Sequence, residues 1–372
     1  MVDLKAQYLR LKNEVDAALM QTVESAQYIN GPQVQTFADA LQSYLSVETV
    51  VPCANGTDAL QLALMALDLE PGDEVITTAF SFVASAEVIA LLGLTPVFAD
   101  IHPQTFNIDA KDVERRITSK TRVILPVHLF GQPAEMEAIM EVADRHGLYV
   151  IEDVAQSLGA TCFYKGAYQQ AGTIGHIGCT SFFPTKNLGC FGDGGACYTQ
   201  DAALAARIKR MAAHGADRPY HHKVVGINSR LDTLQAAVLN VKLPWLDRFI
   251  SERQRVAAVY DSHLKEVEQI AIPVVAEHTT HTYNQYTICV KNGRRDEVMK
   301  ALEAMGIPSR IYYPVPLHRQ PAFCHYASAA WPLTNAEKAC SEVLSLPMHT
   351  EMKPGEAAYI GRAIVDLFEK NA

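Results

Sequence analysis

The segment with the clearest potential for chemistry is SFFPTKNLG, residues 181–189, in which Lys186 stands among aromatic and apolar neighbours. No other lysine occurs between Lys165 and Lys209. A lysine removed from water is costly as a cation and useful as a nucleophilic amine, because burial lowers its pKa. The alternative is an ordinary lysine whose stem is buried and whose charged end reaches the solvent. The surroundings of Lys186 must decide between the two.

Other candidate residues directly follow predicted strands. Gly56 and Thr57 come after TVVPC, where a glycine turn and a Thr57 cap would begin a helix whose free N–H groups suit a phosphate. Phe82 follows DEVITTAF and would open the next helix, while Asp153 and Gln156 follow LYVI. Taken singly, each has an ordinary explanation: a capped turn, a core aromatic ring, or a carboxylate that caps a turn.

The combination of these features is more specific than any one of them. A phosphate-binding helix end, a stacking ring, a carboxylate for a protonated ring nitrogen and an isolated amine are together what pyridoxal phosphate requires. Ser181, Thr185 and the glycines Gly192, Gly194 and Gly195 surround the lysine. Neither the Walker pattern nor GxGxxG is present, so the sequence does not support binding of ATP or NAD.

Residues 50 to about 200 predict the elements that position these side chains. Short, almost wholly apolar runs alternate with helical patterns. This is typical of an α/β fold whose mainly parallel sheet is covered by helices on both faces. In such sheets ligands bind beyond the carboxyl ends of the strands, which is where the candidate residues fall.

The pattern changes after about residue 245. A long helix is expected from near Pro244, followed by a strand within 282–290, a helix over 294–307 and a terminal helix over 355–370. We therefore expect two domains. Residues 1–245 would hold the N-terminal helices and the large, cofactor-binding domain, and residues 246–372 a smaller C-terminal α+β domain.

Composition excludes several classes of function. The 372 residues are 49% hydrophobic and 20% charged, with a formal net charge of −9, so nucleic acid is not an expected partner. No apolar run is long enough to span a bilayer, and the N-terminus lacks a signal-peptide core. The eight cysteines form no CxxC pair and the thirteen histidines no HExxH. We expect a cytoplasmic protein without disulfides, bound metal or membrane attachment.

Five segments, in this order, resemble the DegT/StrS-type sugar aminotransferases: GTDAL, EDVAQSLGA, SFFPTKNLG, GDGGA and GINSRLDTLQAA. The resemblance runs essentially from end to end. It implies the aspartate-aminotransferase-like (type I) fold, pyridoxal 5'-phosphate as cofactor and a homodimer with active sites at the subunit interface. It also implies transfer of an amino group from glutamate to a keto-sugar nucleotide.

The resemblance also implies a role for each candidate residue. Lys186 would be the catalytic lysine that forms a Schiff base with the cofactor, and Asp153 would pair with the pyridinium nitrogen. The other cofactor contacts would be Gln156 to the ring hydroxyl, Phe82 stacked on the ring, and Gly56, Thr57 and Ser181 at the phosphate, with Asn228 reaching it from the neighbouring subunit. On the substrate side stand Arg230, Tyr312, Tyr313 and His318.

Two of these substrate-side residues carry a further expectation. Arg230 is suited to clamp a uronate carboxylate; the alternative is that it pairs across the dimer or contacts a diphosphate. Tyr312 departs from the family pattern, since a histidine commonly stands there.

The substrate is expected from three further segments. AQYINGPQV, YHHKVVGINSRLDTLQAA and YYPVPLHRQPAF look closest, within the family, to enzymes that make 3-amino sugars. The expected acceptor is the 3-keto form of a UDP-2-acetamido-2-deoxy-glucuronate, used for a surface polysaccharide such as an O-antigen. The alternative acceptor is a dTDP-3-keto-6-deoxyhexose.

Two other functions stay open on the sequence. Family members with histidine at the lysine position catalyse dehydration or deoxygenation, and the intact Lys186 favours transamination over such a pyridoxal-phosphate-dependent sugar dehydratase. The other hypothesis is a non-catalytic regulator that has the same fold.

Overall fold

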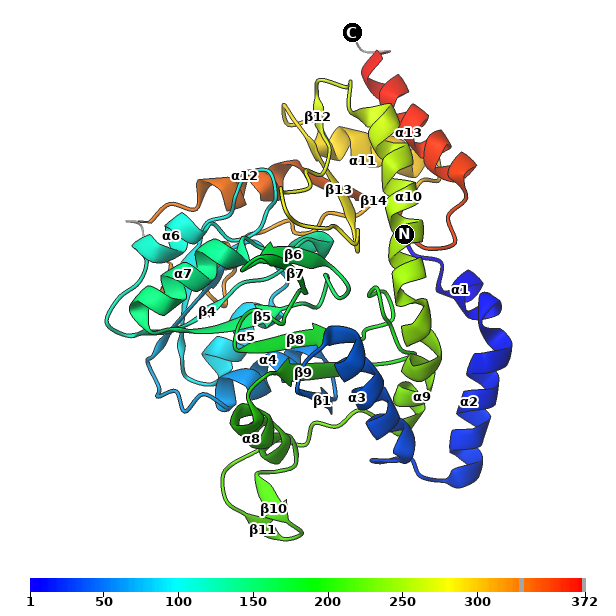
Figure 1. The fold of residues 1–372 in the computed structure, drawn as a ribbon. Coiled ribbons are helices and arrows are strands. Elements are labelled where there is room, and N and C mark those ends of the chain that lie inside the picture. Colours follow the sequence, from blue (N-terminus) through cyan, green and yellow to red (C-terminus); the bar gives the residue numbers. More distant parts are fainter. Residues whose placement is uncertain (328–330, 370–372) are drawn as a thin grey trace.

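The computed structural model describes residues 1–327 and 331–369, and a seven-stranded sheet lies at its centre (Figure 1). The strand order is β1-β9-β8-β5-β4-β2-β3. The strands are β1 (Thr49–Cys53), β2 (Glu74–Thr78), β3 (Thr95–Ala99), β4 (Thr121–Leu125), β5 (Tyr149–Asp153), β8 (Ile177–Ser181) and β9 (Gly195–Thr199). All pairings from β3 to β8 are parallel, and β9 runs antiparallel to both of its neighbours. The predicted α/β fold with a mainly parallel sheet is confirmed.

Helices cover both faces of this sheet, which explains why its strands are apolar throughout. Successive residues of β2 fill different cores: Val75 packs in one cluster and Ile76 in another. The Val75 face is covered by α4 (Gly56–Met65), α5 (Ala84–Leu91) and α8 (Ala202–Ala212). The opposite face is covered by α3 (Pro32–Leu45), α6 (Ala110–Arg115), α7 (Met136–His146) and α9 (Thr233–Lys242).

A second, smaller sheet follows the long helix α10 (Leu246–Leu264). Its three antiparallel strands are β12 (Ile270–Ala271), β13 (Tyr286–Val290) and β14 (Val343–Leu346), with α11 (Arg295–Ala304) and α13 (Pro354–Glu369) packed around them. Helix α10 begins just after Pro244, which lies in the short 3-10 turn Leu243–Trp245. Lys370, which the sequence assigned to the terminal helix, lies outside the described residues.

The chain returns to the large sheet after the small one has begun. Leu317, in the 3-10 turn Leu317–Arg319, donates its N–H to the carbonyl of Ala79 at 2.8 Å. Phe323 and Ala336, the latter in α12 (Thr334–Glu342), share a core cluster with residues of β2 and α4. The boundary at residue 245 stays a prediction. The parts of the chain that pack on the large sheet and on the small sheet alternate along the sequence.

Several other elements complete the fold. The N-terminus forms α1 (Leu4–Arg10) and α2 (Lys12–Ser25), which lie along α9 and α10 (Figure 1). Two hairpins, β6 (Thr161–Tyr164) with β7 (Ala167–Gln170) and β10 (Ala216–Arg218) with β11 (His221–His222), had no clear pattern in the sequence. In the part of the chain that the structure describes, no helix is long and apolar enough to cross a bilayer.

Candidate active site

Lys186 lies in the loop that joins β8 to β9, and hydrogen bonds close this loop at both ends. The N–H of Phe182 donates to the carbonyl of Gly194 at 2.7 Å, and the N–H of Cys190 donates to the carbonyl of Phe182 at 2.8 Å. The Phe182 ring is fully buried and meets Phe37 edge to face at 5.2 Å. The loop is therefore anchored on the core, and the candidate lysine projects from an ordered segment.

Burial lowers the pKa of the Lys186 amine, and the nearby Asp153 carboxylate opposes this shift. By accessible surface the side chain is half-buried, so it keeps an opening to one side. Of the two interpretations of this lysine, the structure favours the partly desolvated amine over a surface lysine with a buried stem.

Asp153 ends β5 and is 6% exposed. Burial raises the pKa of its carboxyl, while the N–H of Ala155, which donates to Oδ1 at 3.0 Å, and the charge of Lys186 lower it. Its backbone is fixed on both sides, since its N–H donates to the carbonyl of Pro126 and its carbonyl accepts from the N–H of His128. The structure thus brings Lys186 and Asp153 together at the carboxyl ends of β5 and β8.

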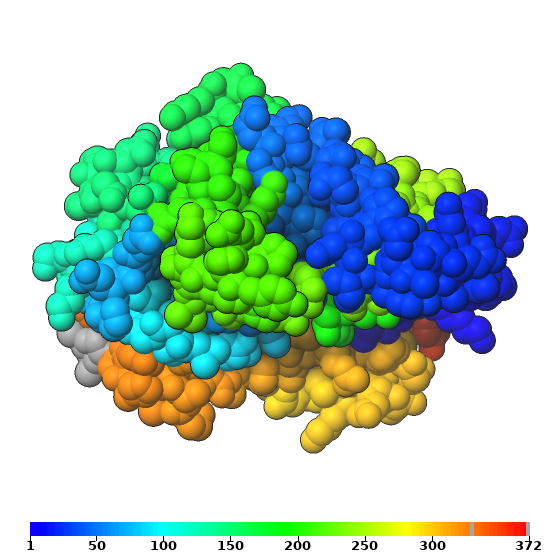
Figure 2. All heavy atoms as spheres, turned by 90° about the horizontal axis from the view of Figure 1, so that it is seen from below, coloured from blue at the N-terminus to red at the C-terminus, as the bar shows by residue number. Residues whose placement is uncertain are grey.

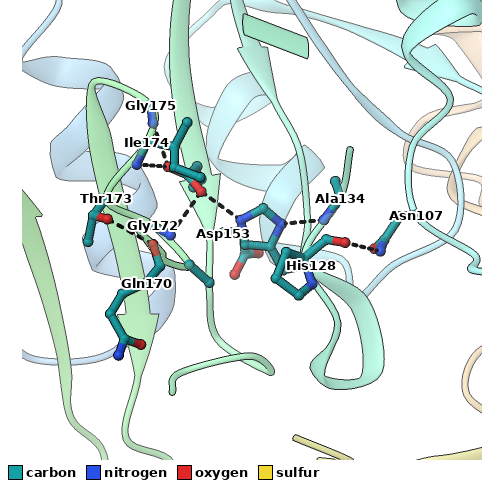
Figure 3. A network of polar contacts seen from close by, with 12 residues as sticks. Asn107, His128, Ala134, Asp153, Gln170, Gly172, Thr173, Ile174 and Gly175 are labelled. Atoms are coloured by element: carbon teal, nitrogen blue, oxygen red, sulfur yellow. Dashed lines mark hydrogen bonds and ion pairs between the residues drawn. The ribbon is translucent and has the colours of Figure 1, made fainter. Parts of the chain in front are cut away.

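A buried polar network supports this strand end (Figure 3). The carboxylate of Glu152 accepts four hydrogen bonds: from Nε2 of His128 at 2.8 Å and from the N–H groups of Gly172, Ile174 and Gly175 at 2.8, 2.9 and 2.6 Å. Nδ1 of His128 accepts from the N–H of Ala134 at 3.0 Å, so the ring proton lies on Nε2. Both side chains are 0% exposed. The network joins β5 to two neighbouring loops directly behind Asp153.

Gln156, Tyr313 and Phe82 form the next part of the site. Oε1 of Gln156 accepts from the N–H of Phe130 at 2.7 Å, and Nε2 donates to the hydroxyl of Tyr313 at 3.0 Å. The Phe82 ring lies 6.5 Å from that of Tyr313 and is 55% exposed. Phe82 precedes α5 instead of opening it, because the helix begins at Ala84. An exposed ring next to Tyr313, the partner of Gln156, is available to a planar ligand.

The amino end of α4 supplies free N–H groups next to Ser181. Gly56 is so close to Ser181 that a Cβ on the glycine would meet the serine Cβ at 2.6 Å. The predicted cap is wrong: Asn55 caps α4, accepting from the N–H of Asp58 at 2.8 Å, and Thr57 lies within the first turn. Asn55 takes this position because its extended backbone aims its side chain at that N–H. The N–H groups of Gly56 and Thr57 have no partner inside the helix, so they remain available to a ligand.

The remaining predicted residues do not all join this cluster. Asn228 and Arg230 are exposed on the segment between β11 and α9. Tyr312 is half-buried and touches Tyr313 edge to face at 5.9 Å. His318 is buried and its Nε2 lies 3.0 Å from Oε1 of Glu337. It faces a cavity of about 330 Å³ that is also lined by Glu74 and Thr95, the first residues of β2 and β3.

Two features of the site were missed in the sequence. The first is the hydrogen bond between His128 and Glu152, which belongs to the polar network behind Asp153. The position of His128 directly after the apolar run TRVILPV could have indicated it. Lys242 lies far along the sequence on α9, yet its amine reaches the carbonyl of Gly189 in the Lys186 loop. No local pattern marks that contact. Among the described residues, no group of three or more histidine, cysteine or acidic side chains is arranged to hold a metal ion.

Comparison with known proteins identifies relatives along nearly the whole chain. The model of the DegT/DnrJ/EryC1/StrS aminotransferase family matches residues 10–365. A UDP-2-acetamido-2-deoxy-3-oxo-D-glucuronate aminotransferase of Pseudomonas aeruginosa is 45% identical over 98% of this chain and 99% of its own. A dTDP-3-amino-3,4,6-trideoxy-alpha-D-glucose transaminase of Streptomyces venezuelae is 40% identical over 99% of this chain and 96% of its own.

The fold is similar to that of a solved structure that contains a cofactor. The crystal structure of NtdA from Bacillus subtilis with bound cofactor PMP superposes with a TM-score of 0.89 and 31% identity, covering 97% of this chain and 82% of the other. A DegT DnrJ EryC1 StrS aminotransferase from Brucella abortus superposes with a TM-score of 0.94 and 40% identity, covering 99% of this chain and 98% of the other, and this similarity confirms the predicted aspartate-aminotransferase-like fold.

Proposed function

Since the chain belongs to the DegT/DnrJ/EryC1/StrS aminotransferase family, we propose that this transaminase moves an amino group from glutamate to the 3-keto position of a UDP-2-acetamido-2-deoxy-glucuronate. The observation that carries the reaction type is the pairing of a partly buried amine, Lys186, with a buried carboxylate, Asp153. The sugar follows from the Pseudomonas aeruginosa relative, whose name specifies this acceptor.

Pyridoxal 5'-phosphate is the cofactor of this family, and the residues present fit it. The N–H groups of Gly56 and Thr57 begin a helix directly beside Ser181, so these two N–H groups and the serine hydroxyl would hold the phosphate. The exposed Phe82 ring would cover one face of the pyridine ring, and Gln156 would contact the ring hydroxyl. Asp153 would accept a hydrogen bond from the ring nitrogen.

When bound, the cofactor supplies an aldehyde and an electron-accepting ring that carry the amino group between the two substrates. The carboxylate of Asp153 would keep the ring nitrogen protonated, because a buried anion favours a cation beside it. Nζ of Lys186 would accept and return the proton that moves during the transfer, and its lowered pKa favours the neutral amine that this role requires. Phe182 and Phe37 hold the base of the loop, which keeps this amine in place.

We further propose that the active site is shared between two copies of the chain. Apolar side chains near the Lys186 loop are exposed, among them Phe82, Phe183 and Phe191. Tyr220 and Val225 of the β10–β11 hairpin segment are 95% and 88% exposed, and this segment stands on the surface in Figure 2. A second copy would cover these side chains and would bring its own Asn228 to the phosphate. That arrangement accounts for an Asn228 that is exposed in the single chain.

The cysteines indicate the compartment in which the reaction would take place. Seven of the eight cysteines are buried as free thiols, which fits a reducing cytoplasm. A 3-amino sugar nucleotide made there would serve surface polysaccharide synthesis, such as that of an O-antigen.

The second candidate acceptor is a dTDP-3-keto-6-deoxyhexose, supported by the Streptomyces venezuelae relative. Arg230 separates the two, because its exposed guanidinium can bind a uronate carboxylate, which a 6-deoxy sugar lacks.

One experiment tests both parts of the proposal. The purified protein is reduced with borohydride, and the labelled lysine is identified by mass spectrometry; we expect Lys186. The unreduced protein is then mixed with UDP-2-acetamido-3-amino-2,3-dideoxyglucuronate or with dTDP-3-amino-3,6-dideoxyhexoses, and the visible band of the cofactor is followed. We expect the UDP-uronate to change it at the lowest concentration. A colourless protein would refute the aminotransferase, and a preference for the dTDP sugars would refute only the proposed acceptor.

A further inference from the structure

A second lysine approaches the Lys186 loop from outside the predicted site. Lys242 is the last residue of α9 and is 2% exposed. Its Nζ donates to the carbonyl of Gly189 at 2.6 Å and lies 5.2 Å from the centre of the Phe191 ring. Within residues 1–327 and 331–369 no ion pair is recorded for it, and burial lowers the pKa of its amine to about 8. A buried cation that is held by one carbonyl and one ring is costly, so its position calls for an explanation.

The carbonyl that Lys242 holds belongs to a tightly folded part of the loop. A Cβ at Gly189 would come within 2.5 Å of the carbonyl oxygen of Pro184, so the chain after Lys186 lies directly against the chain before it. The N–H of Lys186 donates to the carbonyl of Phe183 at 2.9 Å inside this fold. Any movement of Gly189 is therefore passed to the turn from which Lys186 projects.

Other contacts fix the rest of the loop, and Lys242 completes the set. The side chain of Asn187 donates to the hydroxyl of Thr282 at 2.7 Å. The N–H of Phe191 donates to Oε1 of Gln235 at 2.8 Å, and its ring meets Tyr8 of α1 at 6.0 Å. Gly189 lies between these two points and has no side chain with which to hold itself. Its carbonyl is fixed from α9 by the amine of Lys242.

We propose that Lys242 is a positioning residue for Lys186: it holds the Gly189 carbonyl so that the turn at Lys186 presents its amine beside Asp153. The inference rests on the proposed role of Lys186 and concerns the reaction of that amine with the aldehyde of pyridoxal phosphate. A hydrogen bond from a charged donor is stronger than one from a neutral group, which suits an anchor for an otherwise free carbonyl. The aim of a reacting amine is sensitive to displacements of about 1 Å.

The test compares three variants that differ in what they offer to a backbone carbonyl. Lys242→Met keeps the length and the apolar stem but has no donor, while Lys242→Arg keeps a charged donor. Lys291→Met is the matched control, because Nζ of Lys291 donates to the carbonyl of Glu268 at 2.8 Å on the surface of the small domain. Cofactor-free protein is mixed with pyridoxal phosphate, and borohydride is added after timed intervals. Mass spectrometry then gives the rate at which Lys186 is modified.

We expect Lys242→Met to fold and to modify Lys186 more slowly, on the order of 10- to 100-fold. Lys242→Arg should restore most of the rate, and Lys291→Met should match the unaltered protein. Hydrogen exchange, which needs no cofactor, should show faster exchange of the amides over residues 186–190 in Lys242→Met alone. Rates in Lys242→Met equal to those of the unaltered protein would overturn the inference, even if exchange increased, because the contact would then be only structural.

The same experiment separates this inference from the proposed function. If the unaltered protein were labelled on a lysine other than Lys186, the assignment of the catalytic lysine would fail and the inference with it. If the unaltered protein is labelled on Lys186 and the variants do not differ in rate, only the role of Lys242 fails.

Discussion

At the scale of single residues, the site combines two side chains, Asp153 and Lys186, whose charged forms are both destabilised by burial when no ligand is bound. Burial raises the pKa of Asp153 and lowers the pKa of Lys186, and in both cases this exceeds their mutual attraction. Each residue is thus pushed toward its neutral form in the cofactor-free protein. Burying these two groups lowers the stability of the cofactor-free fold, and it places a carboxyl group and an amine where a cofactor can bind.

The cofactor-free double variant Lys186→Met, Asp153→Asn should therefore be more stable than the unaltered protein. Removing a buried, poorly solvated pair is expected to raise the free energy of unfolding at pH 7 by about 1–4 kcal/mol. Urea denaturation of the two cofactor-free proteins measures the difference.

The gain should depend on pH in a defined direction. A raised Asp153 pKa makes stability fall as pH rises from the ordinary aspartate pKa to the folded one, since the folded chain then binds more protons. A lowered Lys186 pKa makes stability rise as pH moves from the folded value to the ordinary lysine pKa. The gain is therefore largest between these two ranges and shrinks in acid and in alkali. A gain that does not change with pH would contradict the charge cost as its cause.

Single residues also show how far the sequence can be interpreted. Asp153, Gln156 and Phe82 were predicted as site residues because they follow strands of a parallel sheet, a rule that needs no three-dimensional information. The cap at Thr57 was wrong because two neighbouring residues can both cap a helix, and only the backbone conformation decides between Asn55 and Thr57. Lys242 could not be found, since its contact with Gly189 joins positions 53 residues apart.

At the scale of elements, the end of β5 is held by one carboxylate. Glu152 connects the strand to the loop at 172–175 and, through His128, to the chain after β4. All four donors are satisfied by two carboxylate oxygens, which is the full capacity of an ionised carboxyl group in this geometry. The strand ends where it does because these loops close over it.

Glu152→Gln should destabilise the protein although it hardly changes the shape of the side chain. The amide keeps one acceptor oxygen and turns an NH2 group toward donors, so buried N–H groups lose their partner. We expect a loss of roughly 3 kcal/mol in the free energy of unfolding, measured by urea denaturation.

Glu74→Gln is the matched control for this change. Glu74 begins β2, and its Oε2 accepts from the hydroxyls of Thr118 and Thr121 at 2.5 and 3.0 Å. Hydroxyl groups can rotate and accept instead of donating, so this variant should lose no more than about 1 kcal/mol. Equal losses of unfolding free energy in the two variants would show that the backbone N–H groups around Glu152 do not account for the larger loss expected at that position.

Element prediction succeeded where a hydrophobic pattern was strong and failed where pairing decided. The strands and helices between residues 49 and 153 lie where the apolar runs indicated them. The antiparallel direction of β9 has no signal in its own residues, because it depends on how the Lys186 loop returns the chain to the sheet. The short hairpins β6–β7 and β10–β11 carry too few apolar residues to show a period.

At the scale of the whole molecule, the proposed shared site can be tested by mixing inactive proteins. Lys186→Ala removes the proposed catalytic amine, and Asn228→Asp places a negative charge where the proposal has a phosphate bound. Each variant alone should have little activity. When the two are unfolded and refolded together, heterodimers form in which one of the two sites has both residues intact, provided that Asn228 acts across the interface.

We expect the mixture to recover about a quarter of the normal activity, because half of the dimers are mixed and each has one intact site of two. The measurement is the rate of sugar amination as the ratio of the two proteins is varied. If Asn228 served its own chain, every site in the mixture would carry one of the two defects, and activity would stay at the level of the separate variants.

The surfaces that a second copy would cover are beyond sequence patterns, because an exposed Phe191 or Tyr220 and a buried one look alike in a sequence. Only the folded chain shows which apolar side chains are left outside.

Because residues after 245 return to the core of the large sheet, the protein cannot simply be divided at that position. A polypeptide ending at residue 245 would lack Leu317, Phe323 and Ala336, which fill the core beside β2 and α4. A polypeptide beginning at residue 246 would carry these side chains with nothing to cover them. Neither half is a candidate for separate expression, and a protease cut near residue 245 should leave two fragments that stay associated until both unfold.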